Sequence, residues 1–329
     1  MESFKGHRGT FIESMNGIVV IDKPSGKTSH DVVENVKRAL TVKKAGHTGT
    51  LDPMATGVLP VCINEATKLV QFFAMDTKDY TATMLLGVRS DTQDIEGNII
   101  SRNDSHVSVN DIENVMCRFV GRVEQVPPRY SAIKFRGKSL YKWARKGVTI
   151  EPPSRIVEIY AIVMKDAKLP YVTFSVSCSK GTYIRTLCSD IGEILGCGAC
   201  LASLRRTRSG CFSESSAVSL DGSSKKNVSP EHIIPLVDAL PNFPSMYIDH
   251  AFAKKLREGY QPIGEIFRKY HIPSLAAGDM IKLTDKDNNL VSIAKMLYPS
   301  DQIGSLDSKR QVVKILRIFN SDKYTLDRN

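Results

Sequence analysis

The sequence predicts an α+β protein in which one extended sheet carries the larger part of the chain. Segments that alternate apolar and polar residues occur in both halves of the first 220 residues, and amphipathic helical patterns lie between them. Strands from both halves can therefore share one mixed or antiparallel sheet, flanked by helices. A shorter group of strands follows Pro241 and Pro244 and predicts a second, small β module.

The first half of the chain supplies strands and helices in turn. Ser29 is a residue type that often caps a helix, and Asn110 with Glu113 resembles a capping box. A further helix is expected to begin at Glu65 and run to Met75. The expected strands are 17–22, 58–63 and 79–88.

The second half continues the same pattern. We expect a helix over 182–195, and Gly196 is a typical residue to end it. Ser229-Pro230 predicts a short helix that runs to Ala239. The strands expected here are 155–165 and 172–179, and the C-terminal module is expected to contain a helix over 247–257 and strands at 280–284, 290–296 and 312–319.

Composition limits the possible partners and compartments. The chain has 45 Lys and Arg against 35 Asp and Glu, a net charge of +10, which favours a polyanionic partner. No apolar run resembles a secretory signal or reaches membrane-spanning length. Seven scattered cysteines are typical of a reducing compartment. We therefore expect a cytoplasmic protein with no membrane contact.

Two motifs suggest chemistry that their surroundings do not support. Cys197 and Cys200 form a C-x-x-C pair, but no second pair stands at ligand spacing, so we expect no metal site. Gly26-Lys27-Thr28 opens a helix as a P-loop does, yet Ile21 occupies the position of the first required glycine. A nucleotide-hydrolysing function is therefore disfavoured.

The segment 121–155 combines positive charge with aromatic residues. It holds nine Lys or Arg and two Glu, a net charge of +7. Tyr130, Phe135, Tyr141 and Trp143 are interleaved with these charges. Basic side chains neutralise phosphates and aromatic rings stack on unpaired bases, so the segment as a whole favours RNA binding. The alternative is a solvated charged helix whose aromatic rings face the core.

The segment 46–57, GHTGTLDPMATG, is the most informative part of the chain. Three glycines surround a single carboxylate, Asp52, between a helical pattern and an apolar strand. Such glycines allow sharp turns and a close backbone approach to a ligand. Alone, this pattern is also typical of a tight turn. The whole string, however, closely resembles the catalytic loop of the TruB-type pseudouridine synthases.

Further motifs of that family follow in order over 17–209. They are IDKPSG at 21–26, NEATK at 64–68, KDY at 78–80, CSKGTYIRT at 178–186 and LRR at 204–206. The resemblance implies Asp52, Tyr80 and Arg185 as catalytic residues, with Arg185 paired to the aspartate. It implies substrate contacts by the following residues: Lys23, His47, Lys68, Lys180, Tyr183 and Leu204.

The sequence is expected to divide into three parts, of which the resemblance covers the middle one. A flexible leader (1–16) precedes a pseudouridine synthase catalytic domain (17–240), whose segment 121–155 is an RNA-binding insertion that clamps tRNA. A small β-barrel-like domain of the PUA type (245–329) follows as an RNA-binding appendage.

The function implied is isomerisation of uridine 55, in the T loop of tRNA, to pseudouridine. The uridine is flipped out of the loop, and the bond from C1′ to N1 is replaced by one from C1′ to C5. No cofactor is required, because no redox change or donor group is involved. Asp52 can attack C1′, attack C6 or deprotonate C2′, and a nearby arginine favours its charged form.

Two rival functions remain at this stage. The first is the archaeal and eukaryotic relative that works in a guide-RNA particle, which shares the Asp52 loop but typically lacks the large insertion. The second is a non-catalytic protein that binds or folds tRNA. The intact set of Asp52, Tyr80 and Arg185 favours an enzyme, and we expect it to act as a monomer on the T stem-loop.

Overall fold

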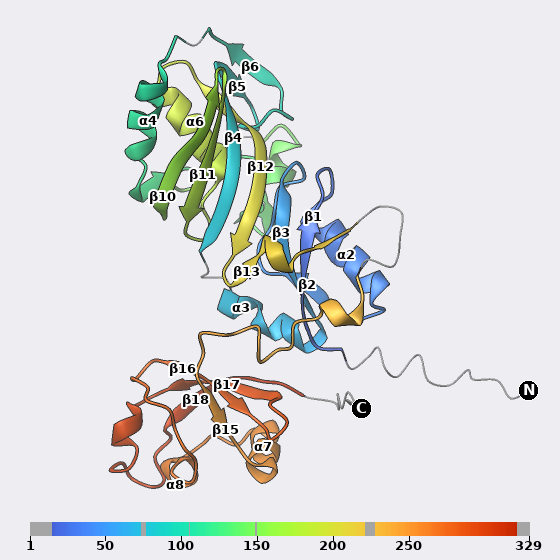
Figure 1. The fold of residues 1–329 in the computed structure, drawn as a ribbon, viewed down its shortest axis with the longest axis vertical. Helices are drawn as coiled ribbons and strands as arrows, with labels where there is room; N and C mark the ends of the chain where they lie inside the picture. Colours follow the sequence, from blue (N-terminus) through green and yellow to red (C-terminus); the bar gives the residue numbers. More distant parts are fainter. Residues whose placement is uncertain (1–14, 74–76, 105, 149, 221–227, 321–329) are drawn as a thin grey trace, which may run out of the picture.

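The computed structural model describes residues 15–73, 77–104, 106–148, 150–220 and 228–320. A large mixed sheet forms one domain and a smaller sheet forms the second (Figure 1). The expectation of an α+β fold is confirmed. No helix in the described part of the chain is both long enough and apolar enough to cross a membrane. The predicted leader lies mainly outside the described residues.

The large sheet has ten strands, and eight of them form its main path. In spatial order these are β14 (Val218–Ser219), β1 (Gly17–Lys23), β3 (Thr56–Ile63), β12 (Ala199–Ser209), β4 (Lys78–Leu86), β11 (Tyr171–Cys178), β10 (Arg155–Lys168) and β7 (Gly121–Gln125). β2 (Ala45–His47) pairs with β3, and β13 (Phe212–Ser213) pairs with β12. The pairs β1–β14 and β3–β12 are parallel, whereas the other pairs along the path are antiparallel.

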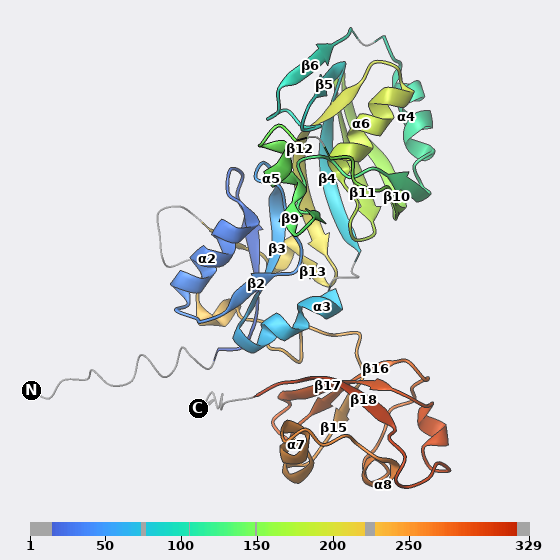
Figure 2. The same ribbon diagram turned by 180° about the vertical axis from the view of Figure 1, so that it is seen from behind.

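Helices cover one face of this sheet. α4 (Val109–Cys117) and α6 (Ile184–Ile194) lie across the β4–β11–β10 part, and Figure 2 shows them in front of the strands. α2 (Ser29–Ala39) packs beside β2 and β3. The alternation expected for 172–179 is confirmed, because Val172, Phe174 and Val176 are buried. Burying a side chain of this size stabilises the fold by roughly 1.5–3 kcal/mol.

The remaining short elements of the larger domain connect the sheet strands. They are the 3₁₀ helices η1 (Asn64–Leu69), η2 (Glu214–Ser216) and η3 (Pro230–His232), the helices α3 (Val70–Phe73) and α5 (Leu140–Ala144), and the strand pairs β5 (Val88–Ser90) with β6 (Ile99–Arg102) and β8 (Lys134–Phe135) with β9 (Lys138–Ser139). A 3₁₀ turn followed by one α turn therefore replaces the continuous helix expected from Glu65.

The C-terminal domain has its own core and a second contact with the large sheet. Its elements are β15 (Ser245–Tyr247), α7 (His250–Arg257), α8 (Gly264–Phe267), β16 (Met280–Thr284), β17 (Leu290–Met296), η4 (Ser300–Gln302) and β18 (Val313–Ile318). Leu290, Ile293 and Phe319 join one buried cluster with Ile18 and Phe73 of the larger domain. The two domains are thus packed against each other by apolar side chains.

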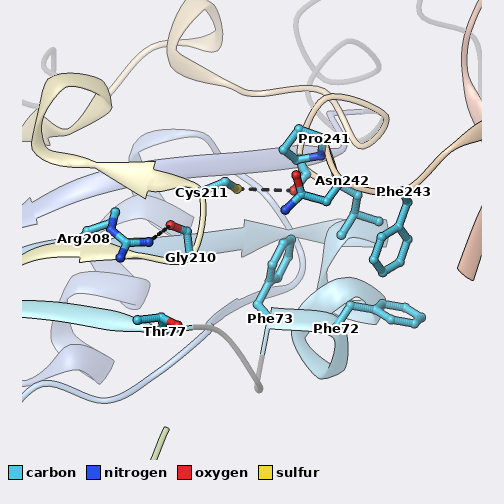
Figure 3. A pocket seen from close by; sticks show the side chains of 11 residues that line it. Phe72, Phe73, Thr77, Arg208, Gly210, Cys211, Pro241, Asn242 and Phe243 are labelled. Carbon is cyan, nitrogen blue, oxygen red and sulfur yellow. Dashed lines mark hydrogen bonds between the residues drawn. The ribbon is translucent and has the colours of Figure 1, made fainter. Parts of the chain in front are cut away.

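A pocket of about 270 Å³ lies at this junction (Figure 3), and Asp52 is not among the residues that line it. Phe72, Phe73 and Phe243 line one side. Arg208 lines another, and its guanidinium is already paired with Asp79 at 2.6 Å.

Two helix starts differ from those expected. The capping box of α4 is formed by Ser108 and Asp111, not by Asn110 and Glu113 as expected. The side chain of each of these two residues bonds to the backbone N–H of the other. Thr28, not Ser29, caps α2 in the same way with Asp31.

Two other helices were expected to be longer than they are. The helix expected from Ser229 to Ala239 ends after one 3₁₀ turn. Ile234 precedes a proline, which disfavours helical backbone, and it exchanges two backbone hydrogen bonds with Ile18 at 2.8 and 2.9 Å. The helix expected over 247–257 begins only at His250, because Tyr247 belongs to β15 and Asp249 caps α7.

The insertion expected at 121–155 also divides differently. Its first five residues form β7 and its last residue begins β10, and these two strands pair in the large sheet. Only residues 126–154, the insertion loop, leave the sheet, and of these residue 149 is not described. The sheet therefore fixes both ends of the insertion loop.

Candidate active site

The loop that carries Asp52 connects β2 to β3, and two buried cations hold its backbone. Lys23 is fully buried, and its ammonium donates to the carbonyls of Pro24, Pro53 and Ala55 at 2.9, 2.9 and 2.6 Å. Arg206 is 1% exposed and donates to the carbonyls of Val58 at 2.7 Å and Gly49 at 3.1 Å. Buried charges require such partners, and here three of the five carbonyls, those of Gly49, Pro53 and Ala55, belong to the loop.

Glycine at position 57 is required for this arrangement. Gly57 has φ +98°, and a Cβ atom there would lie 2.2 Å from the backbone oxygen of Arg206. The parallel contact between β3 and β12 places these two backbones side by side. The glycine therefore lets the Asp52 loop join the sheet directly beside the arginine that holds it.

Arg185 binds Asp52 through two hydrogen bonds. Its Nε donates to Oδ2 at 2.8 Å and its Nη2 donates to Oδ1 at 3.2 Å. Arg185 is 4% exposed, whereas the Asp52 side chain is 32% exposed. The arginine is thus a buried support, and the carboxylate reaches the surface of the site. A bidentate pair of this kind fixes the orientation of a carboxylate as well as its charge.

Three further groups position Arg185. Its Nη1 donates to the carbonyl of Thr92 and its Nη2 donates to that of Tyr130, both at 2.9 Å. The carboxylate of Asp94 lies 3.7 Å from Nη1 and is nearly buried. Asp94 is itself fixed by the hydroxyl of Thr92 at 2.6 Å and by the backbone N–H of Glu96 at 3.1 Å.

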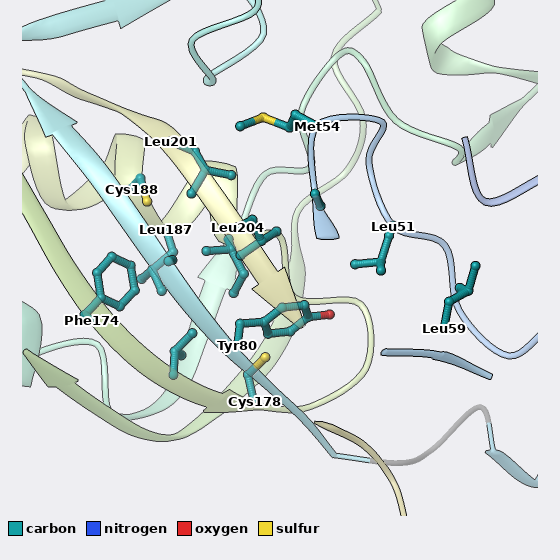
Figure 4. Close-up of a cluster of buried hydrophobic side chains, with 14 of the residues drawn as sticks. Leu51, Met54, Leu59, Tyr80, Phe174, Cys178, Leu187, Cys188, Leu201 and Leu204 are labelled. Atoms are coloured by element: carbon teal, nitrogen blue, oxygen red, sulfur yellow. The ribbon is translucent and has the colours of Figure 1, made fainter. Parts of the chain in front are cut away.

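Tyr80 lies on β4 beneath the same loop. Its ring is 8% exposed and belongs to a buried cluster with Leu204, Cys178, Leu51 and Met54. Figure 4 shows the ring extending from β4 toward the loop that carries Leu51. Burial raises the pKa of the Tyr80 phenol, which outweighs the opposite influence of Arg206. The hydroxyl is therefore protonated at neutral pH.

The other expected substrate contacts have varied surroundings. His47 ends β2 and is half-buried, and its Nδ1 has no hydrogen-bond partner within the described residues. Burial lowers the pKa of His47, and the charges of Arg206 and His30 act in the same direction. Leu204 is buried beside Tyr80, and Lys180 is exposed. Tyr183 caps α6, two residues before Arg185.

Two of the expected substrate lysines already have hydrogen-bond partners within the protein. Lys23 donates to three carbonyls and thereby holds the backbone of the Asp52 loop in place. Lys68 lies on η1 and pairs with Glu65 at 2.6 Å and with the carbonyl of Ile318 at 2.9 Å. This places Lys68 at the contact with the C-terminal domain.

Sequence reasoning missed two members of the site. Asp94 follows a strand in the segment DTQD at 91–94, where clustered acidic and hydroxyl residues were a usable signal. Arg206 stands in the LRR motif, whose leucine alone was expected to matter. Its contacts join residues 148 and 157 positions apart, a relation that local patterns do not reveal.

Comparison with known proteins assigns this arrangement to a family. A family model described as "TruB family pseudouridylate synthase (N terminal domain)" matches residues 37–184, and one described as "tRNA pseudouridylate synthase B C-terminal domain" matches 185–226. A protein of Syntrophus aciditrophicus named tRNA pseudouridine synthase B is 53% identical over 310 residues, 93% of this chain and 99% of its own length. The chain belongs to the TruB family of pseudouridylate synthases.

Other relatives and solved structures agree with this membership. The tRNA pseudouridine synthase B of Geobacter sulfurreducens is 40% identical over 93% of the chain and all of its own length. A solved "Cbf5-Nop10-Gar1 Complex" contains a chain with a TM-score of 0.69 and 29% identity, which covers 95% of this chain and 87% of that one. As a TruB family member the chain is an enzyme with the pseudouridine synthase fold.

Proposed function

We propose that this enzyme converts uridine 55 in the T loop of tRNA to pseudouridine, with Asp52 as the catalytic carboxylate. The observation that carries the proposal is the bidentate ion pair between Asp52 and Arg185. It holds one partly exposed carboxylate in a fixed orientation, on a loop whose Leu51 and Met54 share a buried cluster with Tyr80. Relatives that are 40–53% identical bear the name tRNA pseudouridine synthase B, which supports tRNA as the substrate.

The reaction is an isomerisation whose atoms balance without a co-reactant. The bond from C1′ to N1 breaks, the base turns, a bond from C1′ to C5 forms, and the proton lost from C5 is balanced by one gained at N1. Asp52 acts as nucleophile at C1′ or C6, or as base at C2′. Arg185 keeps the carboxylate oriented and compensates its charge while it reacts.

Tyr80 serves the base rather than the ribose. Its ring offers an apolar surface for the flipped uracil, and its protonated hydroxyl is a donor near the loop. His47 is proposed to fill the place that the flipped base leaves in the RNA loop. Burial favours the neutral imidazole, and a flat neutral ring can stack between the bases of the RNA loop.

The insertion loop is proposed to bind the tRNA backbone and to carry it to the site. Arg136 lies over Phe135, Lys138 over Trp143 and Arg145 over Tyr141, with 5.4–5.6 Å between each charge and the ring centroid. Each of these cations is exposed. The rings hold the charges at the surface, where phosphates can reach them.

The insertion loop and the relatives also favour tRNA over a guide-RNA particle. Identity to the protein in the Cbf5 complex is 29%, against 53% for the Syntrophus tRNA pseudouridine synthase B. The protein in that solved complex is assembled with Nop10 and Gar1, whereas the Syntrophus relative is named for tRNA alone. We therefore propose a stand-alone monomeric enzyme. The presence of Asp52, Tyr80 and Arg185 together argues against a role in RNA folding alone.

A single-substrate assay tests the proposal. The purified protein is incubated with an unmodified tRNA transcript in chelator, and pseudouridine is located by mass-shift labelling and digestion. We expect one pseudouridine at position 55, and none in a transcript that carries cytidine there. An Asp52→Asn protein serves as the matched control. Pseudouridine at other positions only, or a requirement for an added guide RNA, would overturn the assignment.

A further inference from the structure

The two residues at which the insertion loop leaves and re-enters the sheet both contact Tyr183. Gln125 is the last residue of β7 and Arg155 the first of β10, and they are direct cross-strand partners. Between them the chain makes the whole insertion loop. The register of two paired strands thus brings the base of an RNA-binding element to one point beside α6.

Gln125 fixes the backbone of Tyr183. Its side-chain oxygen accepts from the backbone N–H of Tyr183 at 3.0 Å, and its side-chain nitrogen donates to the Tyr183 carbonyl at 3.3 Å. The Gln125 side chain is 1% exposed, so these bonds are shielded from water. A buried amide that satisfies both groups of one residue holds that residue in place more firmly than a surface contact does.

Arg155 fixes the ring of the same residue. Its guanidinium carbon lies 4.6 Å from the centroid of the Tyr183 ring, the shortest cation–π distance among the described residues. Its Nε and Nη2 are buried and have no hydrogen-bond partner within the described part of the chain. The guanidinium also lies within 3.4 Å of the position that a Cβ on Gly181 would take. Arg155 is therefore placed by stacking against Tyr183 rather than by an ion pair.

Tyr183 in turn determines where Arg185 stands. It is the N-cap of α6, and its carbonyl accepts the helical hydrogen bond from Leu187 at 3.0 Å. Arg185 is the second residue of that helix and reaches Asp52 from there. Arg185 also donates to the carbonyl of Tyr130, within the insertion loop. The insertion loop consequently meets the catalytic arginine twice, directly at Tyr130 and through its base at Tyr183.

We propose that Gln125 and Arg155 are positioning residues, which hold the start of α6 so that Arg185 is aligned with Asp52 and with the insertion loop. This inference rests on the proposed function. Neither residue contacts the reacting atoms. Their contribution is orientation of the carboxylate, and small displacements of a reacting group lower the rate strongly. The alternative is that these contacts only stabilise the edge of the sheet, so that replacing the two residues would lower the stability of the protein and leave its rate unchanged.

Arg155→Met tests the proposal, with Lys165→Met as the matched control. Lys165 is exposed on the same strand, so its replacement removes the same charge from β10 without touching Tyr183. We expect Arg155→Met to lower the single-turnover rate at saturating tRNA by about tenfold while the Kd for tRNA changes by less than about threefold. Arg155→Lys keeps a cation above the ring and should recover part of the lost rate.

A double-mutant cycle with Tyr183→Leu assigns the effect to the stack. If Arg155 acts through the ring, Arg155→Met should have almost no further effect on the rate once the ring is gone. In a Tyr183→Phe background, which keeps the ring, Arg155→Met should cost about as much as in the original protein. Additive losses in the Tyr183→Leu background would overturn the proposal.

Amide hydrogen exchange provides a readout that does not require activity. Arg155→Met should speed exchange at the amides of Tyr183 and Leu187, and Lys165→Met should not. If the original protein formed no pseudouridine, the proposed function would fail, and the exchange rates would still decide whether Arg155 holds α6. Unchanged exchange at both amides, or an unchanged rate on tRNA with normal exchange elsewhere, would refute the positioning role.

Discussion

The Asp52 loop and the insertion loop use positive charge in opposite ways. Around Asp52, Lys23 and Arg206 are buried and donate to backbone carbonyls. In the insertion loop, Arg136 and Lys138 are exposed and rest on aromatic rings. The first pair builds fixed geometry, whereas the second remains available for phosphates. Under the proposed function, the buried cations serve the geometry of the Asp52 loop, and the exposed cations of the insertion loop serve tRNA binding.

The largest effect is expected at the carboxylate itself. Asp52→Asn keeps the shape of the side chain and its hydrogen bonds to Arg185 in part, but an amide is neither a nucleophile nor a base at neutral pH. Turnover should fall by at least about 10³-fold, and the Kd for tRNA should stay within about threefold. Single-turnover assays on freshly prepared, deamidation-free protein measure the first quantity. Normal turnover would remove Asp52 from the mechanism.

Substitution of one glycine in each loop tests how rigid the Asp52 loop and the insertion loop are. Gly57 and Gly137 have φ +98° and +77°, but only a Cβ at Gly57 would meet another backbone. Gly57→Ala should destabilise the protein by roughly 2 kcal/mol or more and lower the rate. Gly137→Ala in the insertion loop should cost about 1 kcal/mol and leave the rate unchanged. Equal thermal shifts in both variants would contradict the contrast.

The buried ammonium of Lys23 makes stability depend on pH. Burial lowers the pKa of Lys23 to about 8, against the usual 10.5 that applies in the unfolded chain. Between these values the unfolded chain binds a proton that the folded protein does not, so stability rises with pH in that window. Relative to Lys23→Met, the original protein should gain on the order of 1–3 kcal/mol between pH 8 and 10.5. Urea unfolding measures this difference, and a decrease with pH would contradict it.

The smallest effect is expected at Lys68. Lys68→Met removes the bonds to Glu65 and to the carbonyl of Ile318 in the C-terminal domain. We expect a loss of about 1 kcal/mol in stability and little change in the affinity for tRNA. A marked loss of tRNA affinity with unchanged thermal stability would instead return Lys68 to the substrate contacts that its motif implies.

The sequence allowed the site to be predicted where its residues sit in unbroken motifs. Asp52 stands in a loop whose glycines and length are distinctive, and Arg185 follows a recognisable turn at the start of a helix. The alternation of 172–179 likewise predicted β11, because a half-buried strand exposes its pattern directly.

What the sequence did not reveal depends on contacts between distant segments. Arg206 was overlooked because its role is defined by carbonyls of the Asp52 loop. The carbonyl partners of Lys23 and Lys68 were also not visible, since a lysine in a motif does not show which carbonyls it will bind, and their contact with substrate stays a prediction. The helix expected up to Ala239 failed for a related reason, as Ile234 pairs with Ile18 across the fold.

The most direct test of the division between catalysis and tRNA binding compares two variants in one experiment. The first is Asp52→Asn, and the second replaces Arg136, Lys138, Lys142 and Lys146 by Ala. For each, the Kd for tRNA is measured across a salt series, together with the single-turnover rate at saturating tRNA. The quadruple variant should bind more weakly at low salt, with the slope of log K reduced by about 0.7–0.9 for each lost phosphate contact.

Asp52→Asn should show the opposite result, with an unchanged slope and no turnover, while the quadruple variant keeps a near-normal rate. Unchanged affinity and salt slope in the quadruple variant would contradict this account. So would a loss of its rate at saturating tRNA as large as that of Asp52→Asn, because tRNA binding and catalysis would then not be divided between these two sets of side chains.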